Sequence, residues 1–419
     1  MSRSCCGILS FLVLVSCSPA LAADASHQQE RTIAVRGDDG QSLQTFTLLP
    51  DGRVAALLAS DMHRGPQDAE ASHGSEIRLF DAAGESSAVW QVDFAAQSIA
   101  AGSDGTVLVG GDGRLVKFDA NGTQLASIEL PYLKEAIADT EKLRERAAAL
   151  QEQYKESRAE ATAQLEAQKT EIAEKLAELK AKDETDLTAA EKRRIKRFEQ
   201  QLSQFDDFAL QFEIPSVDDL VKQLTDRLRI INGITVTDRD VFVVTGESSG
   251  FGYSVWRMDH SFQESKQVLA ELRGCCGQMD VRASGDELFV AENCSHRVGR
   301  YSRDGEKIAD IGTRSEREAA GGDTPPDSED SGFGGCCNPM NLCIGDDGLV
   351  YTAESEGIIR CFTSGGEYRG LIGSAKLSGG CKNVAVAVSA DGETVYFCDK
   401  PGQRIIVLSR NDAVADTAE

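Results

Sequence analysis

Short apolar runs alternate with tight-turn residues through the last third of the chain, and the pattern repeats. One unit reads "GCCGQMDVRASGDELFVAENCSHRVGRYSRDGEKIADIG" and the next reads "GCCNPMNLCIGDDGLVYTAESEGIIRCFTSGGEYRGLIG". A shorter third unit reads "GGCKNVAVAVSADGETVYFCDKPGQRIIVLS". The first two units each contain four runs of β-strand type, separated by turns such as Asp-Gly and Gly-Gly. Four short strands in about forty residues are typical of one blade of a β-propeller.

The same pattern fits three earlier stretches, at 46–94, 99–130 and 231–272, which brings the number of units to six. The last unit lacks its outermost strand after Ser409, whereas Arg31–Gly37 is a β-type run that belongs to no unit. We therefore expect the N-terminal run to complete the last blade, because this pairing closes the ring and removes a free sheet edge.

A helical segment interrupts the repeats between the second and third units. Residues 132–182 contain no Gly or Pro, and their apolar positions recur every three or four residues, which predicts one long amphipathic helix with coiled-coil character. Thr188 and Glu191 have the spacing of a capping box at the start of a second helix, which Pro215 ends. A third helix is expected in "SVDDLVKQLTDRLR". This segment is either a self-packed antiparallel hairpin or an arm for self-association or for a coiled-coil partner.

The predicted fold class is therefore an all-β six-bladed β-propeller with an inserted α-helical coiled-coil hairpin. Its N-terminus has the features of a leader, with Arg3 before a short apolar run. "ALA" at 20–22 fits a signal-peptidase site, whereas "LVSC" fits a bacterial lipobox in which Cys17 carries lipid. Both interpretations predict export to a periplasmic or extracellular site. The expected parts are a signal peptide at 1–22, propeller at 31–130, helical insertion at 131–229, propeller at 230–410 and a disordered tail at 411–419.

Charge narrows the classes of partner. The chain of 419 residues has a formal net charge of −24. Nucleic acids and anionic membrane surfaces require a basic footprint, so neither is an expected partner. No segment after the leader is apolar and long enough to cross a bilayer, which leaves a lipid on Cys17 as the expected route to a membrane.

The last three units resemble the NHL-repeat family of six-bladed β-propellers. The resemblance rests on Asp-Gly before the second strand, on an acid that follows this strand (Glu292, Glu354, Asp399), and on an Arg with apolar or aromatic residues in the third strand. It is weaker in the earlier units. It implies a propeller that serves as a scaffold for a protein or small-molecule ligand.

Cysteine is concentrated in these same units. Three of the twelve cysteines lie in the leader, and the other nine lie in the last third of the chain. In a propeller, the loop before the first strand of a blade and the loop between its second and third strands open on the same face. This topology predicts a ligand or partner face made of Cys275, Cys276, Cys294, His296, Cys336, Cys337, Cys381 and Cys398. Cys343 and Cys361 are expected within strands.

Three interpretations of this face stay open. Export permits disulfides between neighbouring blades, although nine is an odd number. Each Cys-Cys pair could instead form a strained ring, because adjacent α-carbons are about 3.8 Å apart, below the usual disulfide range. The third is a soft-metal site for Cu or Zn. Its candidate ligands are Cys275, Cys276, Cys336, Cys337, Cys381 and His296, with Met279 and Met340 expected to pack between blades.

No catalytic residue is predicted. Propellers similar to this one include metal-dependent lyases and lactonases, and a rival metal site could combine Asp61, His63 and His73 with His296. The acidic stretch 317–335 lacks the residue order of a calcium loop, so Ca²⁺ binding there would be weak. Nucleophile-elbow, phosphate-loop and H-E-x-x-H motifs are absent from the sequence. The sequence thus favours a binding or scaffold protein that requires no cofactor. The alternatives are a lyase- or lactonase-type metalloenzyme and a soft-metal-binding propeller.

Overall fold

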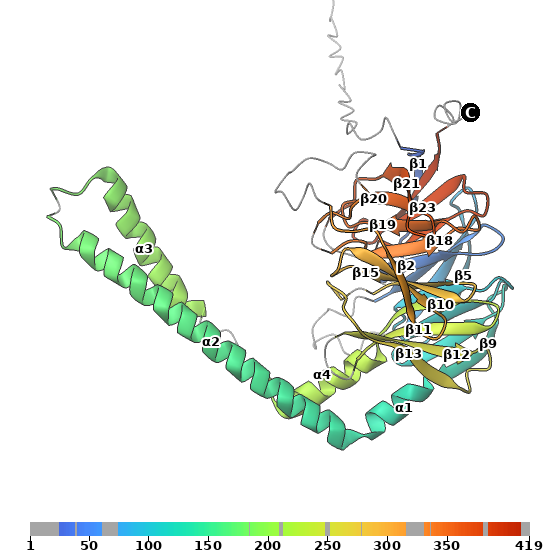
Figure 1. Ribbon diagram of the computed structural model, residues 1–419, viewed down its shortest axis with the longest axis horizontal. Helices are drawn as coiled ribbons and strands as arrows, with labels where there is room; N and C mark the ends of the chain where they lie inside the picture. The colour runs from blue at the N-terminus through green and yellow to red at the C-terminus, as the bar shows by residue number, and fades with distance from the viewer. Residues whose placement is uncertain are drawn as a thin grey trace, which may run out of the picture.

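The computed structural model describes residues 25–37, 40–60, 74–183, 185–208, 213–247, 252–277, 279–315, 331–335, 337–379 and 384–411. In these residues the chain forms six four-stranded antiparallel sheets and four helices (Figure 1). We number the sheets 1 to 6 in the order of their first strands.

Four consecutive strands form each of sheets 1 to 5. Sheet 1 contains β2 (Ser42–Leu48), β3 (Val54–Ala59), β4 (Ser75–Phe80) and β5 (Ser86–Val92), and sheet 2 contains β6 (Ser98–Ala101), β7 (Val107–Gly111), β8 (Arg114–Phe118) and β9 (Gln124–Glu129). Sheet 3 contains β10 (Ile231–Val236), β11 (Asp240–Gly246), β12 (Tyr253–Asp259) and β13 (Ser265–Leu272), and sheet 4 contains β14 (Val281–Ser284), β15 (Glu287–Glu292), β16 (Arg297–Ser302) and β17 (Lys307–Ile311). Sheet 5 contains β18 (Asn341–Ile344), β19 (Val350–Ala353), β20 (Ile358–Phe362) and β21 (Tyr368–Ser374).

Sheet 6 joins the two ends of the described chain. It contains β22 (Val386–Val388), β23 (Thr394–Asp399), β24 (Arg404–Arg410) and, at its outer edge, the N-terminal strand β1 (His27–Ala34). β1 runs antiparallel to β24, from the pair His27–Arg410 to the pair Ala34–Arg404. The His27 ring also lies 3.0 Å from the Gly392 carbonyl oxygen. This pairing is the closure that the sequence predicts for the unassigned run at 31–37.

The first strands of the six sheets make a closed ring. β2 contacts β6, β6 contacts β10, and the series continues through β14, β18 and β22 back to β2. Each sheet then extends outward, and apolar side chains fill the space between neighbouring sheets. Phe289 of sheet 4 and Phe362 of sheet 5, for example, share one cluster with Phe333. Sheets packed radially around a central ring define a β-propeller.

The acid at the end of the second strand, or directly after it, has a structural role in each of the last three sheets. Glu292 pairs with Arg297, Glu354 with Arg360 and Asp399 with Arg404. All three carboxylates are buried, and a buried charge requires a charged or hydrogen-bonding partner. The acid and arginine of the repeated motif therefore stabilise the turn between the second and third strands.

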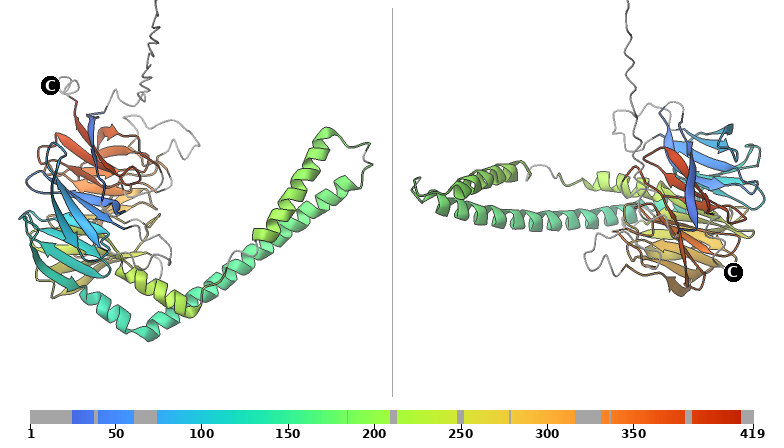
Figure 2. Two further views of the ribbon diagram at one scale, coloured as in Figure 1. Left: turned by 180° about the vertical axis from the view of Figure 1, so that it is seen from behind. Right: turned by 90° about the horizontal axis from the view of Figure 1, so that it is seen from above.

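Four helices lie between sheets 2 and 3 and form an arm that projects from the propeller (Figures 1 and 2). They are α1 (Pro131–Ala138), α2 (Thr140–Lys180), α3 (Ala189–Phe208) and α4 (Val217–Arg229). The prediction of one helix over 132–182 was wrong, because the chain turns between α1 and α2. Asp139 has a non-helical backbone (φ −79°, ψ 67°), and its side chain accepts a hydrogen bond from the Lys142 amide at 3.1 Å. An N-cap of this kind starts a new helix without Gly or Pro.

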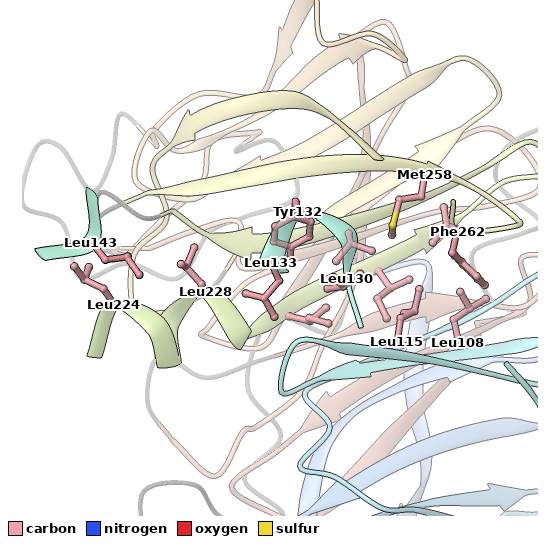
Figure 3. Packing of buried hydrophobic residues seen from close by; sticks show 14 of the residues in the cluster. Leu108, Leu115, Leu130, Tyr132, Leu133, Leu143, Leu224, Leu228, Met258 and Phe262 are labelled. Atoms are coloured by element: carbon pink, nitrogen blue, oxygen red, sulfur yellow. The ribbon is translucent and has the colours of Figure 1, made fainter. Parts of the chain in front are cut away.

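The base of the arm packs into the propeller (Figure 3). Side chains from α1, α2 and α4 share one buried cluster with side chains of sheets 2 and 3, namely Tyr132, Leu133, Leu143, Leu224, Leu228, Leu108, Leu115, Met258 and Phe262. Both ends of the insertion bond to Gly113, whose amide donates to the Arg229 carbonyl oxygen (2.7 Å) and whose own carbonyl accepts from Leu130 (3.0 Å). The arm therefore leaves and rejoins the propeller at one place.

Farther out, α3 packs along α2, and Lys180 pairs with Glu199 at 2.7 Å. The predicted capping box at Thr188 and Glu191 is present, and the structure adds a second one at Ser216 and Asp219, which was not predicted. None of the helices in the described ranges combines the length and apolar character that a bilayer span requires.

Candidate functional site

Three thiols from two neighbouring sheets meet at one place. Cys275 and Cys276 lie in the loop between β13 and β14, and Cys337 lies in the segment that leads into β18. The Sγ atoms of Cys275 and Cys337 are 2.8 Å apart, those of Cys276 and Cys337 are 3.3 Å apart, and those of Cys275 and Cys276 are 3.6 Å apart. Contact between β14 and β18 brings these loops together across about sixty residues of sequence. We call these three residues the thiol cluster.

Two buried asparagines hold the loops that carry the thiol cluster. The Asn293 side chain accepts a hydrogen bond from the Cys275 amide at 2.7 Å and donates to the Cys275 carbonyl oxygen at 3.4 Å. Asn338 donates to the Gly334 carbonyl oxygen at 2.7 Å and accepts from the Ser355 amide at 2.9 Å. Both asparagines are fully buried. Each loop is therefore fixed to the turn after a second strand, which restricts the positions of the sulfur atoms.

His296 links the same two sheets. Its Nε2 atom lies 3.0 Å from the Gly335 carbonyl oxygen, two residues before Cys337. His296 and Cys276 both have a left-handed backbone, with φ of 52° and 55°. This region is uncommon for residues other than glycine, and such residues concentrate at functional sites.

The three thiols of the cluster differ in exposure and in electrostatic environment. Cys276 is exposed, Cys275 is half-buried and Cys337 is buried. The hydrogen bond from the Cys337 thiol lowers the pKa of Cys275 below its ordinary value of 9.0, because it favours the thiolate form. Partial burial raises the pKa of the neighbouring Cys294, and a negative charge on Cys275 adds to this shift. Cys275 thus ionises more readily than an isolated cysteine.

The cluster contains only part of the predicted face. Cys294 and His296 lie beside it, in the turn between β15 and β16. The prediction that Cys398 lies in a loop of this face was wrong, because Cys398 is a buried residue within β23. The strand extends one residue farther, to Asp399. The Asp399 carboxylate accepts hydrogen bonds from Arg404 and Ser378. The other predicted candidates, Cys17, Asp61, His63, His73, Cys336 and Cys381, lie outside the described residues, as does most of 317–335.

The remaining thiols and the methionines belong to the core. Cys343 and Cys361 lie in β18 and β20, as predicted, and both face the same residue of the strand between them, Tyr351. Met279 and Met340 are buried, as expected for residues that pack between sheets. The Asn293 side chain donates to the Met340 sulfur at 3.8 Å, so this thioether also helps to position the loop.

The thiol cluster has the donor set of a soft-metal site. In the part of the chain that the structure describes, it is the group of His, Cys and acidic side chains whose ligand atoms all lie within 4.8 Å of one another. Three sulfur atoms around an ion at about 2.3 Å in tetrahedral geometry are about 3.8 Å apart. The observed distances of 2.8, 3.3 and 3.6 Å require the sulfurs to spread by at most about 1 Å. The largest part of that movement separates Cys275 from Cys337, and the half-buried side chain of Cys275 has more freedom to make it than the buried Cys337.

Asn293 and Asn338 were not among the residues predicted from the sequence. A signal for both was present, since each is adjacent to a cysteine of the repeat, in "AENC" and in "CCNPM". Asparagine is common in loops because its side chain can satisfy backbone donors and acceptors.

No family model matches this sequence, and no curated protein matches it. Solved structures that resemble the fold along most of the chain include the following two. The WD40 domain of Neurospora crassa Pan2 is 9% identical, with 93% of this chain and 97% of that chain covered and a TM-score of 0.43. The calcium-binding protein regucalcin from Agrobacterium tumefaciens is 12% identical, with coverages of 90% and 93% and a TM-score of 0.42. The β-propeller assignment rests on the sheet topology and the ring of first strands, and membership of the NHL-repeat family stays a prediction.

Proposed function

We propose that the protein is an exported six-bladed β-propeller that binds a soft metal ion, Cu(I), at the thiol cluster. The observation that supports the proposal is the convergence of three sulfur atoms from two sheets, with no pair more than 3.6 Å apart. A disulfide would join two of these thiols and would leave the third without a role. A metal ion can bind all three. Three thiolates are a donor set that soft ions prefer.

The coordination number favours Cu(I) over Zn²⁺. Structural zinc is almost always bound by four ligands in tetrahedral geometry, whereas among the residues that the structure describes the cluster presents three sulfur atoms within 4.8 Å of one another. Cu(I) is stable with three sulfur ligands in a plane. The net charge of −24 also favours the approach of a cation. In this proposal the propeller is the scaffold for the site, and the helical arm serves assembly with a protein partner or a second copy of the chain.

The test is a competitive titration of the reduced full-length protein with Cu(I), in the absence of oxygen, against a chromophoric Cu(I) chelator. We expect one ion per chain, with the ultraviolet absorption of copper–thiolate bonds. Cys337→Ala should lower the affinity by more than about 100-fold, beyond the effect of an outer-shell change. Cys294→Ser is the matched control, because Cys294 lies on the same face but outside the three-sulfur group, and it should retain the ion.

Two results would overturn the proposal. One is a failure of the wild-type protein to compete with the chelator. The other is an unchanged affinity in the Cys337→Ala variant. A parallel titration with Zn²⁺ compares the affinities of the protein for the two ions. Tighter binding of Zn²⁺ than of Cu(I) would contradict the three-coordinate assignment.

A further inference from the structure

We infer that Cys275 and Cys337 form a thiol–disulfide couple that reacts with small-molecule disulfides. Their Sγ atoms make the shortest contact of the thiol cluster, at 2.8 Å. A disulfide bond is about 2.05 Å long, so the two sulfurs must approach by less than about 1 Å to join. The bond would link sheet 4 to sheet 5, since Cys275 precedes β14 and Cys337 precedes β18.

The other two pairings within the cluster are less suited to a disulfide. Cys275 and Cys276 are adjacent in the chain, and their α-carbons, about 3.8 Å apart, are closer than a relaxed disulfide allows. Cys276 and Cys337 are farther apart, at 3.3 Å against 2.8 Å for Cys275 and Cys337. The geometry therefore selects Cys275 and Cys337.

The two partners have different roles in the exchange. Cys275 is half-buried, so solvent can reach it, and its sulfur receives the hydrogen bond from the Cys337 thiol. A thiolate that solvent can reach is the nucleophile in exchange reactions. Cys337 is buried, so an external disulfide reaches it only through Cys275.

The reaction balances with a small-molecule disulfide as the oxidant. The Cys275 thiolate attacks one sulfur of the disulfide RS–SR, which forms a mixed disulfide and releases one RS⁻. The Cys337 thiol then attacks the Cys275 sulfur and releases the second RS group, which leaves as RSH with the Cys337 proton. Two protein thiols are oxidised, and one small disulfide is reduced to two thiols.

The exchange has a consequence for the ion, and this consequence rests on the proposed function. Oxidation of Cys275 and Cys337 leaves Cys276 as the single thiol of the cluster, and a disulfide sulfur is a poor metal ligand. We therefore expect bound Cu(I) to be released on oxidation and to protect the thiols while it is bound.

The test uses reduced, metal-free full-length protein incubated with glutathione disulfide, followed by peptide mapping without reduction. We expect the peptide 274–282 to be linked to the peptide that carries Cys337. Cys276→Ser should retain the link, and so should Cys294→Ser, the matched control. Cys337→Ala should lower the yield of the link at least about tenfold and trap one glutathione on Cys275. Cys275→Ala should give the same loss, and it alters a less buried position if Cys337→Ala fails to fold.

A link that persists in the Cys275→Ala or Cys337→Ala variant, or absence of any link in the wild type, would overturn the inference. Cu(I) binding is measured separately on reduced protein. A link without Cu(I) binding would retain the couple and refute the proposed function. Cu(I) binding without a link would do the reverse.

Discussion

The last three sheets place the same residue type in two opposite environments. Cys275, in a loop, has a pKa below the ordinary value of 9.0, because a neighbouring thiol donates a hydrogen bond to it. Cys343, Cys361 and Cys398, within strands, have their pKa raised from 9.0 to about 12 by burial. The strand cysteines therefore behave as small apolar side chains, whereas Cys275 has the environment of a reactive thiol.

This difference follows from the repeat itself. Strand positions of a propeller face the neighbouring sheets, so a thiol there loses its water and its tendency to ionise. Loop positions before the first strands gather at one face, where thiols of different sheets meet each other. Cysteine content alone therefore says little about this protein, and the position of a cysteine within the repeat decides its behaviour.

The largest expected difference is in thiol reactivity. In reduced, metal-free protein at pH 8, a thiol with a pKa of about 12 is ionised about 1000-fold less than one with a pKa of 9.0. We therefore expect Cys275 to be alkylated at least about 1000-fold faster than Cys343 or Cys398. Time-resolved alkylation with peptide mass spectrometry measures both rates. Equal rates would show that the strand thiols are open to solvent and that they do not differ in reactivity from Cys275.

The second-largest expected effect is the weakening of ion binding at the thiol cluster by acid. Protons compete with Cu(I) for the thiolates, so the affinity falls as the pH falls. If binding displaces at least one proton per ion, a change from pH 8 to pH 6 should lower the affinity by about 100-fold or more. Competitive titrations at several pH values measure the slope. An affinity independent of pH would show that the ligands are not thiols.

Loss of the hydrogen bonds between Asn293 and the Cys275 backbone, which we call the loop clamp, should have a smaller effect on ion affinity. Asn293→Ala removes both hydrogen bonds to the Cys275 backbone, which loosens one ligand without removing it. Outer-shell changes of this kind cost about 10- to 100-fold in metal affinity, and we expect the lower end of this range. Asn121→Ala, at an exposed turn of sheet 2, is the matched control. An unchanged affinity in Asn293→Ala would mean that the clamp does not position the sulfur.

The smallest expected effect concerns stability in alkali. A strand thiol loses its proton near pH 9.0 in the unfolded chain but only near pH 12 in the folded chain. Above pH 9.0 the unfolded chain thus binds fewer protons, and the free energy of unfolding falls as the pH rises towards 12. Each such thiol contributes a loss of up to about 1.4 kcal/mol between pH 8 and pH 10.

Cys398→Ala should remove one such contribution, so that its free energy of unfolding depends less steeply on pH than that of the wild type. Denaturant unfolding at pH 8 and pH 10 measures both slopes. Because the two pH values are compared within one protein, the constant effect of removing the side chain cancels. Parallel slopes would show that Cys398 ionises equally in both states.

Much of the fold could be predicted from the sequence, because each strand and turn has a local signal. Asp-Gly turns, alternating apolar runs and the unassigned run at 31–37 predict the strands and the closure of sheet 6. The turn at Asp139 was not predicted, because the segment around it contains no Gly or Pro to indicate a helix break. A helix can also end where an Asp side chain caps the next one, and "ADTEK" contained that signal.

The site was less predictable than the fold. The period of about sixty residues predicts that the two Cys-Cys pairs lie on neighbouring sheets. It cannot predict which sulfurs meet. Cys275 is the first cysteine of its pair and makes the shortest contact with Cys337, which is the second cysteine of the other pair. That contact depends on the backbone of each loop, such as the left-handed Cys276, and on the buried asparagines. Asp399 was expected to follow the second strand and Cys398 to lie in the turn beyond it, although the strand includes both residues.

The pairing of β1 with β24 also determines how the protein responds to mechanical force. Since the two strands are antiparallel and His27 lies opposite Arg410, the described ends of the chain emerge side by side from the same edge of sheet 6. Tension that draws these ends apart loads the hydrogen bonds of the β1–β24 ladder one after another, as in a zipper, rather than all together. β1 would therefore detach at low force from the outer edge of sheet 6, while the pairings within the other five sheets stay intact.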